Sequence, residues 1–173
     1  MQRVTGLVVL IVAVLWLELL PHTAIGFAAP AASEDSIAII VNQSNPVENL
    51  SAAELRKILL GERSHWPNGR RITLVMLAPG QPERKAVLRD IYHMNESEFS
   101  NHFIQGLFTG EVFVSPKALG SAAEVRKFVF NVPGAIGYVK GGDTDSSVKV
   151  LRVDGHLPED KEYGIRMQAH SGK

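Results

Sequence analysis

The chain has 173 residues, with 18 Lys plus Arg, 18 Asp plus Glu and no cysteine. The lack of cysteine excludes a disulfide framework, a thiolate nucleophile and a thiolate metal site. A formal net charge of zero gives no electrostatic basis for binding nucleic acid or an anionic membrane surface, so neither partner is expected.

The first thirty residues carry the three parts of an export signal. Arg3 supplies the positive start, an apolar run extends from Leu7 to Leu17, and small residues follow around Ala28. Glu18 interrupts the run before it reaches the roughly 20 apolar residues that a spanning helix needs. We therefore expect a signal peptide at residues 1–28, a periplasmic or otherwise secreted product, and no stable membrane insertion after cleavage. An uncleaved N-terminal anchor is the alternative.

The rest of the chain has the length of one ordinary domain with a single core. We expect a flexible N-terminal segment at residues 29–35, a domain at residues 36–158 and a polar tail at residues 159–173. Three residues of this tail are expected to dock on the domain: Tyr163, Ile165 and Met167.

Short apolar runs rich in β-branched residues alternate with helical patterns along the domain. Four of these runs predict strands: Ser36–Val41, Arg71–Leu77, Ala135–Val139 and Val148–Val153. A further short strand is expected at Glu111–Val114. Strands that alternate with helices predict a layered α/β domain.

Helix starts are marked by capping residues. Ser51 and Glu54 form a capping-box pattern, and Gly61 supplies a left-handed stop. Further helices are expected to begin at Pro82, near Asn95 and Ser97, and at Ser121.

The helix that follows Asn95 is rich in large apolar residues. It carries five of them: Phe99, Phe103, Ile104, Leu107 and Phe108. We expect this helix to cover the core with its aromatic inner face.

No constellation of catalytic or metal-binding residues is found. The chain has no Gly-x-Ser-x-Gly element, and its histidines lack the i, i+4 spacing of a helical zinc site. No pair of carboxylates for acid/base work is found: Asp143 and Asp145 lie in a Gly-rich turn, and Glu159, Asp160 and Glu162 lie in the polar tail. Neither an enzyme nor a cofactor or metal is predicted.

Two turns that follow predicted strands could hold a polar ligand. One is Ala78–Arg84, where a helix start offers free backbone N–H groups and Arg84 adds a cation. The other is Asn42–Pro46. The candidate ligand-binding residues are Ser44, Asn45, Gly80, Gln81 and Arg84. A plain helix start and an ordinary turn are the alternatives.

Three segments together resemble a known family. They are the stretch NLSAAELRKILLGERSHWPNGRRITLVML, the stretch NVPGAIGYV at Asn131–Val139, and VKVLRVDGHLP at Val148–Pro158. They are similar to the phosphate-type substrate-binding proteins of ABC transporters. The resemblance implies a type 2 periplasmic-binding-protein-like fold, with a central mixed sheet flanked by helices, and a bacterial envelope location.

The resemblance has two departures. Relatives are about twice as long and clamp the anion between two lobes, whereas this chain can build one lobe. Where the family carries Arg and then Gly-Ser-Gly-Thr, this chain has Leu77, Gly80, Gln81, Pro82 and Glu83. The resemblance therefore implies weak binding of phosphate or another small oxyanion, with an ABC permease as partner. The alternative is a ligand-free interaction module that binds an envelope protein.

Overall fold

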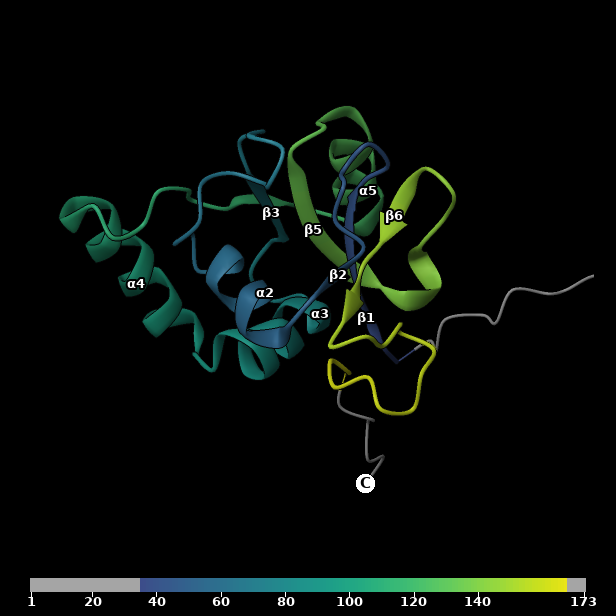
Figure 1. The fold of residues 1–173 in the computed structure, drawn as a ribbon. Helices are drawn as coiled ribbons and strands as arrows, with labels where there is room; N and C mark the ends of the chain where they lie inside the picture. Colours follow the sequence, from purple (N-terminus) through teal and green to yellow (C-terminus); the bar gives the residue numbers. More distant parts are fainter. Residues whose placement is uncertain (1–34, 168–173) are drawn as a thin grey trace, which may run out of the picture.

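A computed structural model describes residues 35–167 (Figure 1). Its centre is a five-stranded sheet with the strand order β4-β3-β5-β1-β6. The five strands are β1 (Ile37–Asn42), β3 (Thr73–Leu77), β4 (Lys117–Leu119), β5 (Ala135–Lys140) and β6 (Val148–Val150). β3 runs parallel to β4 and β5, and β1 runs antiparallel to β5 and β6. This mixed sheet confirms the predicted fold class.

Helices cover both faces of the sheet. Gly137 and Tyr138 are adjacent on β5, so their Cα–Cβ directions point to opposite faces. A Cβ on Gly137 would approach Val125 and Val129 of α5 (Ala122–Asn131). Tyr138 lies on the other face, where α3 (Pro82–Val87) packs on β1 and β3. The apolar runs of the central strands are therefore buried on both sides.

The predicted helix starts are confirmed. Ser51 and Glu54 form both halves of a capping box at α2 (Ala52–Leu59), and Gly61 follows with a φ of 77°. Pro82 takes a first-turn position of α3, which continues into the π-helix η1 (Leu88–Tyr92). Asn95 caps α4 (Glu96–Thr109). A short 3₁₀ turn, η2 (Gly141–Asp143), follows β5.

Two strand predictions need correction. Residues 111–114 form no strand, because the N–H groups of Val112 and Phe113 donate to the carbonyls of Gly106 and Gly61. The predicted strand Val148–Val153 is split at Leu151 into β6 and β7 (Arg152–Val153). β7 leaves the main sheet and pairs in parallel with β2 (Asn49–Leu50), which makes a separate two-stranded ribbon.

The expectation that α4 covers the core with an aromatic inner face is confirmed for Phe99 and Phe103, but the helix also has an exposed apolar side. Only Phe99, Phe103 and Gly106 are buried, whereas Ile104 and its neighbours at 107 and 108 are exposed. The physical reason is that α4 projects beyond the sheet (Figure 1), so only the side that meets η1 finds core to pack on.

The C-terminal segment docks beside β1. The Tyr163 hydroxyl donates to the Ile37 carbonyl at 2.6 Å, and the Ile37 N–H donates to the Ile165 carbonyl at 3.0 Å. The Met167 N–H donates to the Asp35 carbonyl at 2.7 Å. The expected docking of this tail is therefore confirmed as far as residue 167.

Within residues 35–167, no helix has the length and apolar character needed to cross a membrane. The predicted signal peptide, at residues 1–28, lies outside the described residues and stays a prediction.

Candidate functional site

The two predicted ligand turns lie at opposite ends of the sheet. Val41, near the end of β1, pairs with Ile136, and Ile136 pairs with Leu74, near the start of β3. The turn with Ser44 and Asn45 therefore lies beside the beginning of β3, whereas Gly80 and Gln81 follow its end. The guanidinium of Arg70, just before β3, donates to Ser44 Oγ at 3.0 Å. The structure does not bring the five predicted residues together.

Arg84 is buried, and its positive charge is paired with a carboxylate of the protein itself. Its side chain is 5% exposed, and Nε and Nη2 donate to the two carboxylate oxygens of Glu96 at 2.7 and 2.8 Å. Nη1 donates to the Leu77 carbonyl at 2.9 Å, and the guanidinium carbon lies 5.0 Å from the centre of the Phe99 ring. An external anion would have to displace Glu96 to reach this guanidinium.

Sequence reasoning missed Glu96. It lies at the first position of α4, twelve residues after Arg84, and η1 folds back between them. No spacing rule predicts such a pair, because the separation depends on a π-helix and a left-handed His93.

The other two residues of this turn are more open. Gly80 has a φ of 94°, and no atom lies within 4 Å of the position a Cβ would take. Gln81 is the N-cap of α3 without a side-chain capping bond, and its Nε2 reaches the Gly120 carbonyl at 3.4 Å. The turn therefore exposes backbone but presents no unpaired cation of its own among the described residues.

The side chains of the first turn stabilise the turn itself. Asn42 Oδ1 accepts from the N–H and the hydroxyl of Ser44, at 2.9 and 2.8 Å. Asn45 is 3% exposed, and its Oδ1 accepts from the Val47 N–H at 3.0 Å. These bonds are those of an Asx turn.

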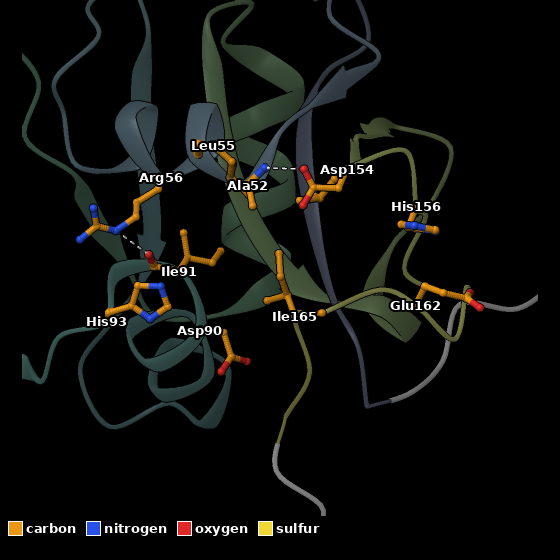
Figure 2. A pocket seen from close by; sticks show the side chains of 13 residues that line it. Ala52, Leu55, Arg56, Asp90, Ile91, His93, Asp154, His156, Glu162 and Ile165 are labelled. Atoms are coloured by element: carbon orange, nitrogen blue, oxygen red, sulfur yellow. Dashed lines mark hydrogen bonds between the residues drawn. The ribbon is translucent and has the colours of Figure 1, made fainter.

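A pocket of about 370 Å³ lies elsewhere (Figure 2). Its walls come from the start of α2, from η1 with His93, from the turn after β7 and from the C-terminal segment. Four buried apolar side chains line it: Leu55, Ile91, Val153 and Ile165. Six polar side chains join them: Arg56, Asp90, His93, Asp154, His156 and Glu162. None of the five predicted ligand residues lines this pocket.

A second feature is the exposed apolar side of α4, which we call the α4 face. It consists of Ile104, Leu107 and Phe108, which are 55%, 50% and 89% exposed. Phe113, in the loop that follows the helix, is also exposed. Residues 90–116 contain no Lys or Arg but include four acidic residues: Asp90, Glu96, Glu98 and Glu111.

Comparisons with known proteins identify the family. A model of the PBP superfamily domain matches residues 27–164. The phosphate-binding protein PstS of Bacillus subtilis (strain 168) is 28% identical over 161 residues, which cover 84% of this chain and 48% of that protein.

Solved structures show the same fold. The structure of a phosphate ABC transporter substrate-binding protein with bound phosphate, from Clostridium perfringens, superposes with a TM-score of 0.58 at 23% identity, covering 70% of this chain and 46% of that chain. PstS from Borrelia burgdorferi superposes with a TM-score of 0.60 at 17% identity, covering 77% of this chain and 55% of that chain. This chain thus spans about half the length of these relatives, and the match over most of its residues shows that it belongs to the PBP superfamily.

Proposed function

We propose that the chain is exported and works in the cell envelope as a docking module whose α4 face binds a partner protein. One observation carries the proposal: three large apolar side chains are exposed together on consecutive turns of one helix. Burying apolar surface contributes about 25 cal/mol per Å². Contiguous exposed apolar patches therefore often mark interaction sites.

The opposite side of α4 is anchored. Phe99 and Phe103 are buried with their ring centres 4.7 Å apart, and the Tyr92 ring meets Phe99 edge-on at 5.0 Å. Val112 packs so closely on Gly106 that a Cβ there would lie 2.3 Å from it. The helix is thereby held in place while it presents the α4 face, so docking needs little ordering of the helix itself.

The charge of the segment that carries the α4 face favours one class of partner. Residues 90–116 contain no Lys or Arg, and Glu98 and Glu111 form no ion pair within the described part of the chain, whereas Asp90 and Glu96 are paired with Arg89 and Arg84. A partner surface that is apolar at its centre and lined by Lys or Arg at its rim would therefore fit. The same charges disfavour an anionic membrane surface. An ABC permease or another envelope protein with such a surface is the partner class we propose.

Site-specific photo-cross-linking tests the proposal. A photoreactive residue is placed at position 108 of the full chain in the expressing cells, with exposed Ser146 as the matched control position. The expected product joins position 108, but not 146, to an apolar peptide flanked by Lys or Arg in one envelope protein. A product with a second copy of this chain, or equal products from both positions, would contradict the proposal.

A second candidate function is weak binding of a small oxyanion such as phosphate. The open turn at Gly80 and Gln81 favours it, and two relatives are named for phosphate binding. Glu96 limits it, because the carboxylate already occupies the guanidinium of Arg84 in bidentate geometry. Ser44 and Asn45 would belong to a separate site, with Arg70 and Lys149 as nearby cations.

Thermal unfolding with phosphate, with sulfate and without added anion tests this candidate. An anion at about 100 times its dissociation constant stabilises the folded state by about 2.7 kcal/mol. Glu96→Gln should bind phosphate more tightly than the original chain, because the competing carboxylate charge is gone. If neither protein responds to millimolar anion, this second function is excluded.

A further inference from the structure

The pocket in Figure 2 carries an inference that goes beyond docking and beyond oxyanion binding. We infer that it binds a small organic cation with an apolar body, such as a primary ammonium group attached to an aromatic or branched aliphatic group. The inference rests on the shape of the pocket, on which of its polar groups are already paired, and on the backbone that forms it.

The buried side chains that line the pocket are apolar and therefore suit the apolar part of a ligand. Leu55, Ile91, Val153 and Ile165 come from four separate segments, and all four are buried. The volume of about 370 Å³ falls in the range of small-molecule sites. Such sites are usually lined by apolar side chains, together with a few polar groups that orient the ligand.

The polar groups favour a cation. Three carboxylates, those of Asp90, Asp154 and Glu162, and one guanidinium, that of Arg56, line the pocket. Asp90 is already paired with Arg89, whose Nε donates to Asp90 Oδ1 at 2.5 Å, so Asp154 and Glu162 supply the remaining negative charge. Two donors of the Arg56 guanidinium, Nε and Nη2, bond the carbonyls of Ile91 and Tyr92, at 3.1 and 3.2 Å, which fixes the guanidinium against η1. An anionic ligand would therefore meet net negative charge, because Asp154 and Glu162 outnumber the single guanidinium of Arg56.

Acceptors remain available on the same lining. Glu162 forms no hydrogen bond or ion pair with any other residue in the described part of the chain. Asp154 uses Oδ1 to accept from the Ala52 N–H at 3.0 Å, which leaves Oδ2 for a ligand. His93 Nδ1 lies 3.0 Å from the Arg89 carbonyl, which can only accept, so Nδ1 carries the proton and Nε2 of a neutral ring is an acceptor.

The backbone around the pocket is unusual. His93 and Asp154 are the two residues other than glycine with positive φ, at 55° and 51°, within residues 35–167. Both line the pocket, as do Asp90 and Ile91 of the π-helix η1. Left-handed non-glycine residues and π-helical turns are both concentrated at functional sites. Figure 2 shows His93 and Asp90 on one side of the pocket and Asp154 with Glu162 on the other.

A pair of probes with the same apolar body and opposite charge tests the inference. Amide chemical shifts of the full chain are followed by NMR during titration with 2-phenylethylammonium or with 3-phenylpropionate. We expect saturable shifts at Ala53, Val153 and Gly164 with the ammonium probe, and an affinity at least about tenfold lower for the carboxylate probe. No saturable shift with the ammonium probe, or equal affinity for both probes, would overturn the inference.

Two variants test whether the carboxylate of Glu162 contributes to binding of the ammonium probe. Glu162→Gln should raise the dissociation constant of 2-phenylethylammonium about three- to tenfold, because it removes an unpaired carboxylate at the pocket. Glu111→Gln changes an exposed carboxylate that does not line the pocket and should leave the constant unchanged. Equal dissociation constants in both variants would contradict the assigned role of Glu162.

Discussion

Phe103 and Phe108 lie five residues apart on α4, yet Phe103 is 6% exposed and Phe108 is 89% exposed. At about 100° per residue, five residues place their side chains about 140° apart around the helix axis. Phe103 packs on Phe99, whereas Phe108 belongs to the α4 face together with Ile104 and Leu107. This division of one helix into an anchored side and an exposed side is the basis of the proposed docking role.

The two phenylalanines should respond very differently to truncation. Phe103→Ala removes a buried ring and should lower the free energy of unfolding by about 3–5 kcal/mol. Phe108→Ala should change it by less than about 0.5 kcal/mol, because its ring gains little burial on folding. Urea denaturation of the two variants measures the difference. A loss of similar size in both would show that Phe108 is packed in solution and is not available for docking.

The Arg84–Glu96 pair gives a second prediction. Glu96→Gln leaves a buried guanidinium without its counter-charge and should cost about 1–3 kcal/mol of unfolding free energy, a range reduced because Glu96 is partly exposed. The matched control is Glu48→Gln, which removes an exposed partner of Lys149 and should cost less than about 1 kcal/mol. Equal losses in chemical denaturation would mean that the Arg84 pair is as weak as a surface pair.

Local features of this fold could be read from the sequence, because their causes are local. The capping residues Ser51 and Asn95 place helix starts through hydrogen bonds to neighbours three residues away. Features that depend on contacts between distant parts of the chain could not be read from the sequence. The antiparallel direction of β1, which separates Ser44 from Gly80, depends on pairing with a strand almost a hundred residues later.

The candidate site illustrates the same limit. The apolar content of α4 was visible, but a 3.6-residue pattern does not tell which apolar residues find a neighbour, so the exposure of Ile104 was not predicted. The pocket joins Ala52, Ile91, Asp154 and Ile165, and no sequence motif connects these positions.

Gly134 should tolerate no side chain. A Cβ there would lie 2.0 Å from the Arg71 carbonyl oxygen, and the Gly134 carbonyl accepts from the Trp66 indole N–H at 3.0 Å. Gly134→Ala should therefore lower the free energy of unfolding by about 1–3 kcal/mol. Gly164→Ala, whose Cβ would meet no atom within 4 Å, is the control and should have almost no effect. If a thermal scan shows both variants unfolding at the same temperature as the original chain, the close contact at Gly134 is refuted.

The capping box of α2 should make stability depend on acid pH. Hydrogen bonds from the backbone and side chain of Ser51 hold the pKa of Glu54 below its ordinary value of 4.5. A carboxyl group with a lowered folded-state pKa stabilises the fold above pH 4.5, and this contribution is lost as the pH falls through the lowered value.

Glu54→Gln should remove this part of the pH dependence. Between about pH 3 and pH 6, the melting temperature of Glu54→Gln should approach that of the original chain near pH 3 and lie below it near pH 6. Ser51→Ala removes the hydroxyl partner and should weaken the same dependence. A constant difference between Glu54→Gln and the original chain across this range would show that the carboxylate has no such role.

The docking claim is tested most directly by the yield of the envelope cross-link from position 108 when Ile104 and Leu107 are both changed to Glu. Both side chains are exposed, so the double variant should unfold at nearly the same temperature as the original chain. We predict that its cross-link to the partner falls to the level of the Ser146 control. An undiminished cross-link in a folded double variant would contradict the claim that the α4 face is the docking surface.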